Sequence, residues 1–391
     1  MISREELREL AEFECRQPGE LAVTFYFQPS TPKDKSHREE AILAKDMVRK
    51  TLQELEITSR SREVIGDVER ILRLAEGLHG NQARAKVVFA CSPRKLWREF
   101  DLPANSFSSL LFVNRRFHLK PLAPLFSEHP RLWIALVDQQ NAHFIEAYFD
   151  QVREQGAITN PMPRHGRSDG FAGYDAGHTQ RHSEGEVRRH FLATAEILRN
   201  GAERKQFEAL VIGCHDVNWP DLEHQLHPDV RKKVVGRFSA DLGTLTNDRA
   251  VAEALGIVKQ SLVEHQRVLL RETVDQARSN GKGVTGLRRV LRATEMGEVD
   301  TILMSRDYTA RAVECTNCHH LDSHIIPYCS VCGRATQKLD DVCDALVPAA
   351  VRNNLGLVLL PHEETLDQIG NIAALLRFRA DRNKNQMLAA S

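Results

Sequence analysis

The sequence is organised around one stretch, Asn160-Pro-Met-Pro-Arg-His-Gly-Arg-Ser-Asp-Gly-Phe-Ala-Gly-Tyr-Asp-Ala-Gly-His-Thr-Gln-Arg-His182. Two prolines near its start and glycines at 166, 170, 173 and 177, without apolar periodicity, predict a long loop. Ser183 and Glu186 have the spacing of a capping box, so we expect a helix to begin at Ser183. Its apolar face is formed by Val187, Phe191, Thr194, Ala195 and Leu198. Unstructured loops longer than about 12–15 residues are usually functional or disordered, and we interpret this one as functional.

Apolar runs and helical patterns alternate on both sides of this loop. Leu132–Val137 is an unbroken apolar run, typical of a strand buried on both faces. Further strands are expected at residues 21–27, 86–91, 110–113, 142–149, 207–214, 301–304, 356–360 and 372–378, and helices at 38–55, 61–78, 228–235, 247–279, 285–296 and 339–354. This alternation predicts the α/β class. From the length of 391 residues and two turn-rich breaks, we expect three α/β domains, at residues 1–128, 129–279 and 280–391.

The composition is that of a folded globular protein, with 42% hydrophobic and 27% charged residues. The sequence has no run of 18 or more apolar residues, so no membrane span is expected. The first residues lack the apolar core of a signal peptide, and we therefore expect a cytoplasmic protein. Because 53 basic and 53 acidic residues cancel, the whole chain is not a simple nucleic-acid polyelectrolyte, although local patches can contact RNA.

Two Cys-x-x-Cys pairs give the strongest chemical signal. Cys315 and Cys318 are separated by ten residues from Cys329 and Cys332, which is the spacing of a tetrahedral Zn²⁺ site. Four thiolates fill the coordination sphere, so this zinc would be structural, and the insert 315–332 is too short to fold on a core of its own. The alternatives are disulfides or free thiols, or a histidine ligand from among His319, His320 and His324. The remaining cysteines are expected to be buried and unreactive: Cys15, Cys91, Cys214 and Cys343.

Other motifs are weaker. His178 and His182 stand four apart, as metal ligands on a helix do, but Thr179 replaces the glutamate base of the zinc-protease pattern. A short loop with Lys33 and Lys35 has the charge to contact phosphates, and a solvated strand–helix connection is the alternative. No Walker-type phosphate loop and no Gly-x-Ser-x-Gly elbow occur.

Three features in this order are similar to the archaeo-eukaryotic class-1 release factor and Pelota superfamily, specifically its bacterial branch, which includes Balon-like ribosome factors. Residues 116–122 resemble the boundary motif of that branch. Residues 132–138, the loop and 183–200 resemble its middle domain, and 286–300, the cysteine insert and 370–378 resemble its third domain. The resemblance implies an N-terminal domain at the decoding centre and an RNase H-like middle domain whose loop enters the peptidyl transferase centre. It also implies a C-terminal domain with the fold of kink-turn-binding ribosomal proteins, carrying a zinc-ribbon insert and facing a translational GTPase.

The resemblance extends to a short motif in the loop. Release factors of this superfamily carry Gly-Gly-Gln, and related quality-control hydrolases carry Gly-x-x-Gln, which Gly177-His178-Thr179-Gln180 matches. It implies Gln180, with Gly177, as candidate catalytic residues, the glutamine orienting water and nearby N–H groups binding the oxyanion. His178 and Thr179 restrict the backbone where the second glycine would leave it free. Other members, such as Pelota and Balon-like hibernation factors, occupy the ribosomal A site without hydrolysis.

We therefore expect a ribosome-binding translation factor that occupies the A site, in hibernation or in the handling of stalled ribosomes. One alternative is a peptidyl-tRNA hydrolase acting through Gln180, and another is an RNase H-like nuclease whose Mg²⁺ is held by Asp138, Glu146 and Asp216. The expected partners are the ribosome with its rRNA, a translational GTPase such as elongation factor Tu, and tRNA, but no membrane. The candidate RNA-binding residues are Lys33, Lys35, Arg164, His165, Arg167, Arg181, His182, Arg188 and Arg189.

Overall fold

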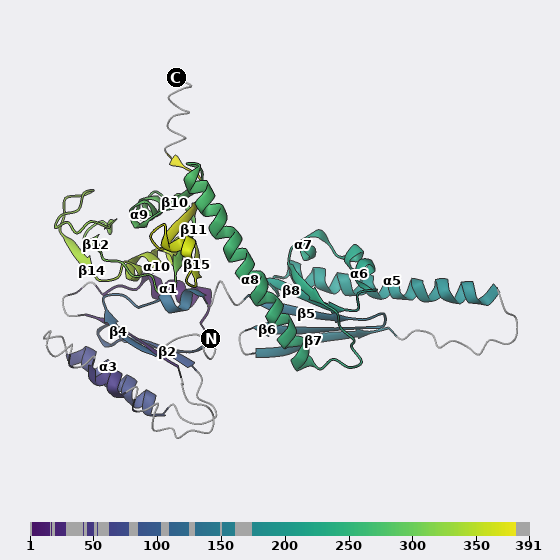
Figure 1. The fold of residues 1–391 in the computed structure, drawn as a ribbon. Coiled ribbons are helices and arrows are strands. Elements are labelled where there is room, and N and C mark those ends of the chain that lie inside the picture. The colour runs from purple at the N-terminus through teal and green to yellow at the C-terminus, as the bar shows by residue number, and fades with distance from the viewer. Residues whose placement is uncertain are drawn as a thin grey trace. The chain divides into compact units, whose positions relative to one another are not determined.

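The computed structural model describes residues 2–15, 17, 20–28, 42, 45–50, 53, 62–77, 85–102, 109–124, 130–148, 151–160 and 174–380, with 174–183 described by their backbone alone. The described strands form four sheets flanked by helices, which confirms the α/β class (Figure 1). The chain divides into two compact units, residues 128–268 on the one hand and 1–127 with 269–391 on the other. The division into three domains stays a prediction, because this grouping does not show which segments fold alone.

Residues 128–268 are built on a five-stranded sheet in the order β7-β6-β5-β8-β9. The strands are β5 (Leu132–Val137), β6 (Asn141–Tyr148), β7 (Gln151–Thr159), β8 (Ala209–Cys214) and β9 (Val234–Phe238). β5, β6 and β7 pair antiparallel, whereas β8 and β9 continue the sheet in parallel. This is the RNase H-like order that the resemblance implied. β5 and β8 are buried along their whole length, as their unbroken apolar runs predict.

Helices cover both faces of this sheet. On one face α5 (Tyr174–Glu203) packs Phe191, Ala195 and Leu198 against the sheet. Gly201 of this helix allows the close approach of the Trp133 ring, since a Cβ there would lie 2.8 Å from it. The short helices α6 (Trp219–Gln225) and α7 (Pro228–Arg231) join the same core. On the other face the first part of α8 (Asn247–Arg278) buries three small side chains: Ala250, Val251 and Ala254.

The sequence missed two features of this sheet and its connections. The helix expected at 228–235 is only the four-residue α7, and residues from Val234 onward form β9 because they pair with β8. The strand β7 was not predicted, since residues 151–159 carry no apolar alternation. It is a strand at the sheet edge whose side chains are almost all exposed, so backbone pairing with β6 forms it without an apolar face.

The first part of the other unit is a four-stranded antiparallel sheet in the order β3-β2-β1-β4. Its strands are β1 (Ala22–Phe27), β2 (Ala85–Cys91), β3 (Leu96–Leu102) and β4 (Leu110–Asn114). The predicted amphipathic helix is present as α3 (Arg62–Gly77), which packs Val64, Val68 and Ile71 onto the sheet. Before the sheet lies α1 (Arg4–Glu12), whose capping box joins Ser3 and Glu6 in both directions. Short 3-10 turns follow β2 and β4 as η1 (Ser92–Arg94) and η2 (Lys120–Leu122).

The C-terminal part of this unit holds a mixed sheet in the order β10-β16-β11-β15. Its strands are β10 (Gly283–Thr285), β11 (Val299–Ser305), β15 (Gly356–Leu360) and β16 (Ile372–Leu376), and its helices are α9 (Leu287–Glu295), α10 (Cys343–Arg352) and α11 (Glu364–Asp367). Between β11 and α10 the chain forms a separate small sheet of β12 (Ala312–Cys315), β13 (Leu321–Asp322) and β14 (Thr336–Leu339). The predicted cysteine insert, residues 315–332, lies between the outer strands of this sheet, and we use the name cysteine insert below for the whole of residues 312–339. Of the helices described, none is both long and apolar enough to cross a membrane.

Candidate functional site

The helix that follows the glycine-rich loop begins earlier than the capping-box pattern predicts. α5 starts at Tyr174 rather than at Ser183, so Ser183 lies inside the helix and is not its N-cap. The backbone of residues 177–180 is therefore helical, where a loop was expected. Residues 174–182 gave no helical signal because they carry no recurring apolar face.

The amino-terminal part of α5 extends past the sheet. The core contacts of the helix begin with Val187, which is partly buried, and continue with Phe191. In Figure 1 the half of α5 that precedes these residues runs beyond the ends of the strands. We call residues 174–186 the α5 arm; at about 1.5 Å per residue it is about 20 Å long. The sheet thus holds the helix at one end and leaves the other end projecting.

Two arginines stand at the base of the arm. Arg188 and Arg189 are both exposed, and Arg189 donates to the carboxylate of Glu186 one turn earlier. Gln180, Arg181 and His182 belong to the helical backbone of the arm, and their side chains lie outside the described part of the chain. The remaining RNA-binding candidates lie outside the described residues: Lys33, Lys35, Arg164, His165 and Arg167. Their roles stay predictions.

A buried histidine that sequence reasoning missed lies next to this base. His190 is fully buried, and neither ring nitrogen makes a hydrogen bond of ordinary geometry with a described residue, although the backbone of Asn141 and the charge of Asp138 lie near enough to act on its pKa. Burial lowers the pKa of His190 below its ordinary value, because the charged ring would lose its hydration. The histidine is therefore neutral and behaves as part of the core beside Phe191.

The three carboxylates considered for a nuclease do not form a cluster. Asp138 accepts hydrogen bonds from the backbone of Gln140 and Asn141 and so closes the predicted turn between β5 and β6. Glu146 faces Arg131 and Gln155. Asp216 accepts from Arg237, which lowers the pKa of that carboxyl. Of the residues described, these three are not among the groups close enough to share a metal ion. The nuclease alternative therefore lacks a metal site here.

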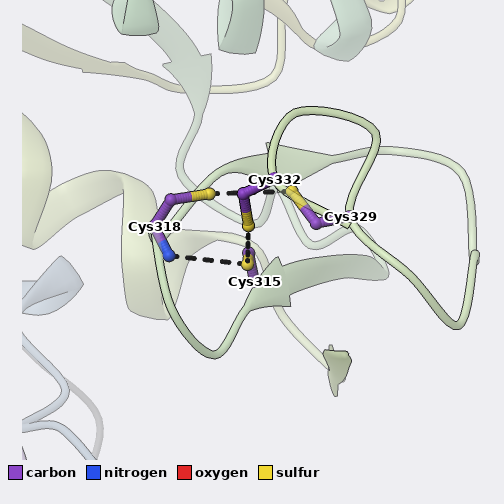
Figure 2. A group of neighbouring side chains, drawn as sticks. All are labelled: Cys315, Cys318, Cys329 and Cys332. Atoms are coloured by element: carbon purple, nitrogen blue, oxygen red, sulfur yellow. Dashed lines mark hydrogen bonds between the residues drawn. The ribbon is translucent and has the colours of Figure 1, made fainter. Parts of the chain in front are cut away.

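The four cysteines of the insert come together as the spacing predicts. All four sulfurs lie within 4.8 Å of one another, with Cys315 and Cys332 3.3 Å apart and Cys318 and Cys329 3.6 Å apart (Figure 2). Tetrahedral coordination with metal–sulfur bonds of about 2.3 Å would place the sulfurs about 3.8 Å apart. The cluster therefore fits a metal ion, and a small side-chain shift would complete the geometry.

The backbone around the cluster supports negatively charged sulfur. Cys315 Sγ accepts from the N–H groups of Asn317 at 3.4 Å and Cys318 at 3.5 Å, and Cys329 Sγ accepts from that of Val331 at 3.4 Å. The backbone of Arg334 and the thiol of Cys315 lower the pKa of Cys332 to about 6. Thiolate, not thiol, is the form that binds metal. Burial and hydrogen bonds with the three neighbouring thiols outweigh the backbone of His320 and raise the pKa of Cys318 to about 12, so a cation that binds here must displace that proton.

The histidines of the insert are engaged elsewhere. Nδ1 of His319 lies 3.1 Å from Glu314, and Nδ1 of His320 lies 2.8 Å from Glu295. His324 pairs with Asp322. A ligand set of four cysteines is thus the arrangement the structure supports. Outside the insert, the cysteines are buried and unpaired by disulfides as expected, although Cys15 and Cys91 bring their sulfurs to 3.8 Å, which the sequence did not predict.

Solved structures similar to this chain include archaeal translation factors. An archaeal translation termination factor, aRF1, is 16% identical over 96% of this chain and 99% of that chain, with a TM-score of 0.26. Pelota of Archaeoglobus fulgidus is 12% identical over 96% of this chain and 93% of that chain, with a TM-score of 0.33. A chain of a ribosome-bound archaeal Pelota and ABCE1 structure is 13% identical over 96% of this chain and 94% of that chain, with a TM-score of 0.43. A comparison with curated proteins gave no match.

The sequence of the middle segment carries the family relationship. Residues 118–258 match the family described as bacterial archaeo-eukaryotic release factor family 10. This segment contains the whole sheet β7-β6-β5-β8-β9 and the whole of α5. In this segment the chain is similar to the bacterial branch of the archaeo-eukaryotic release factors.

Proposed function

We propose that the protein is a ribosome-binding translation factor that occupies the A site and extends the α5 arm into the peptidyl transferase centre, in ribosome hibernation or on stalled ribosomes. The observation that carries this proposal is the arm itself, a helix fixed to a sheet at one end and projecting about 20 Å from it. The arm lies inside the segment that matches the release factor family. It also carries the Gly177-His178-Thr179-Gln180 motif at its outer end.

The base of the arm supports contact with rRNA. Arg188 and Arg189 project from the helix immediately before its packed part, where an RNA phosphate would reach them without disturbing the core. Phosphate contacts release counterions, so binding is expected to weaken steeply as salt rises. Co-sedimentation with ribosomes should therefore fall in R188E/R189E and stay near the parent level in R199E, an equally exposed arginine further along α5. A parent chain that does not sediment with ribosomes at low salt would contradict the proposal.

The backbone of the arm favours A-site occupation over hydrolysis. In an α-helix, the first four N–H groups lack a carbonyl partner, and later ones donate to the fourth residue before them. In α5 the free groups lie at its very start, before Gly177, so the N–H of Gln180 is engaged within the helix. An oxyanion hole needs N–H groups that are free and fixed in direction. Hydrolysis that used the N–H of Gln180 as an oxyanion donor would require this part of the arm to unwind.

Peptidyl-tRNA hydrolysis through Gln180 is the second candidate function, and the Gly-x-x-Gln motif is the observation in its favour. Ribosomes carrying labelled peptidyl-tRNA separate the two. We expect the protein to block the A site without releasing peptide above the background rate, and Q180A to behave as the parent. E196Q, which changes an exposed residue on the packed part of α5, serves as the control. Peptide release that disappears in Q180A, but not in E196Q, would replace occupation with hydrolysis.

We propose further that the metal of the four-cysteine centre is Zn²⁺ and that its role is structural. Four thiolates in tetrahedral spacing are a donor set that zinc prefers and leave no open position for catalysis. Metal analysis of the purified chain under reducing conditions should give one zinc per chain.

The proposed role on the ribosome also predicts two partners, a translational GTPase such as elongation factor Tu, and tRNA. Co-sedimentation of each partner with the ribosome-bound protein tests this.

A further inference from the structure

A buried ionic cluster joins the amino-terminal part of the chain to the cysteine insert. Arg116, just after β4, donates from Nη1 to Glu314 Oε2 at 2.8 Å and from Nη2 to Glu314 Oε1 at 2.7 Å. The same Nη2 donates to Glu14, beyond the end of α1, at 2.5 Å. The side chains of Arg116 and Glu314 are only 9% and 3% exposed. One buried guanidinium thus binds carboxylates from two ends of the unit.

Glu314 is also connected to the cysteine centre, both by its position in the sequence and by its hydrogen bonds. It directly precedes the ligand candidate Cys315 on β12, and its Oε1 lies 3.1 Å from Nδ1 of His319, which directly follows Cys318. Its Oε2 accepts from Gln337 of β14 at 3.2 Å. Glu14, Glu314 and His319 are close enough to share a cation, but Arg116 already supplies the positive charge there. The group is therefore an ion-pair cluster rather than a second metal site.

Other contacts between the amino-terminal and C-terminal parts of the unit surround the ionic cluster. His118 Nδ1 lies 2.9 Å from Asp344, and Asn114 donates to the same carboxylate at 3.1 Å. Arg352 of α10 donates to the carbonyl oxygen of Ala11 in α1 at 2.8 Å. Lys120, which is buried, donates to the carbonyl oxygen of Tyr308. We call these contacts, with the Arg116–Glu314 pair, the docking surface. It holds α1 and residues 114–122 against the C-terminal segment.

We propose that the docking surface depends on metal binding by the four cysteines. The insert has strands of only four, two and four residues, so its own sheet is too small to fix the position of Glu314. A shared metal bond between the two cysteine knuckles fixes it instead, since Cys315 and Cys332 come from opposite ends of the insert. When the ligands part, Glu314 and Gln337 move with them, and the buried guanidinium of Arg116 loses the carboxylate that compensates its charge.

The dependence runs in both directions. If metal binding favours the docked state, then docking must tighten metal binding by the same factor. The side chain of Arg116, which lies outside the insert and touches no cysteine in the described contacts, therefore determines part of the metal affinity. This inference does not rest on the proposed function, because it concerns contacts within the chain alone.

Hydrogen exchange on the full chain, with metal present and after chelation, tests the proposal. Chelation should speed amide exchange in α1 and residues 114–122 by about 5- to 150-fold, the usual range of coupling between two sites. β5 and β8, in the other compact unit, are the internal reference and should not change. Protection of α1 and 114–122 that survives chelation while the insert exchanges freely would overturn the proposal. Loss of protection throughout the unit, including β11 and β15, would overturn it as well.

A pair of variants tests the reverse direction. R116Q should weaken metal affinity, measured by competition with a chromophoric chelator, by the same factor by which chelation speeds exchange. R98Q is the matched control, because Arg98 pairs with Glu9 of α1 at 2.9 Å in an exposed position away from the insert. Its metal affinity should equal that of the parent. Equal affinities in R116Q and the parent would overturn the coupling. If R116Q does not fold, E14Q provides the same comparison, because Glu14 binds the same guanidinium and lies outside the insert.

Discussion

The α5 arm and the cysteine insert are both small extensions of larger α/β units, yet they are held in opposite ways. The arm depends on one continuous backbone helix, anchored by a few apolar side chains at its base such as Phe191. The insert depends on side chains, namely four sulfurs and the polar groups around Glu314. An element stabilised by its own backbone hydrogen bonds can extend away from the core, whereas an element stabilised by side-chain contacts must stay packed against the residues that make those contacts. The arm is therefore suited to contact another molecule, and the insert is suited to hold parts of its own chain together.

The largest effect should come from removing a sulfur of the insert. C329S is expected to abolish stoichiometric metal binding and to unfold the insert, because structural zinc contributes on the order of 10 kcal/mol in isolated zinc fingers. Metal content and thermal unfolding check this. C214A removes a buried thiol from β8 of the other unit and should keep its metal. Full metal content in C329S would show that the sulfur of Cys329 is not needed for metal binding by the insert.

The next largest effect should come from removing the buried ion pair that joins the insert to residues 114–122. R116A leaves Glu314 buried without its compensating charge and should destabilise the unit by about 3–5 kcal/mol. R98A removes an exposed ion pair and should cost less than about 1 kcal/mol. Chemical denaturation of both variants gives the two values. Similar losses in both would mean that burial of Arg116 has little energetic weight.

A smaller effect belongs to the anchor of the arm. The folded protein lowers the pKa of His190 below 6.5, so as pH falls through about 6.5 the unfolded chain takes up a proton that the folded chain does not. The free energy of unfolding of residues 128–268 should therefore decrease as the pH is lowered through this range. H190L should remove that part of the pH dependence and raise stability by about 1–3 kcal/mol, since an unpaired buried polar group is lost. A parallel pH profile in H190L and the parent would contradict this account.

The smallest effect concerns the stiffness of the arm. Gly185 lies inside α5 with open space around it, so G185A should stabilise the helix by about 1 kcal/mol without a clash. Circular dichroism and ribosome binding measure the change. A factor that occupies the A site with a helical arm should bind as well as the parent or better. Weaker binding or lost peptide release in G185A would indicate that the arm must unwind, which favours the hydrolase candidate.

The same contrast explains what the sequence could predict. The cysteine centre was predictable because metal chemistry fixes the ligand spacing, and β15 was predicted to the residue because its apolar run is unbroken. The start of α5 and the strand β7 were not predictable, because neither carries an apolar face. The Arg116–Glu314 pair joins residues 198 apart in the chain, and local pattern says nothing about such partners. The long helix at 247–279 was found almost completely as α8 (Asn247–Arg278).

The edge strand β7 has a consequence for how copies of this protein behave in solution. An edge strand offers unpaired backbone groups to which a neighbouring molecule can add a strand. Here the edge carries exposed charges, Arg153 and Glu154, and the pairing of β7 with β6 is irregular near Ile145. Both the charges and the irregular register make this edge a poor template, so strand addition at β7 should be disfavoured even though its side chains are exposed.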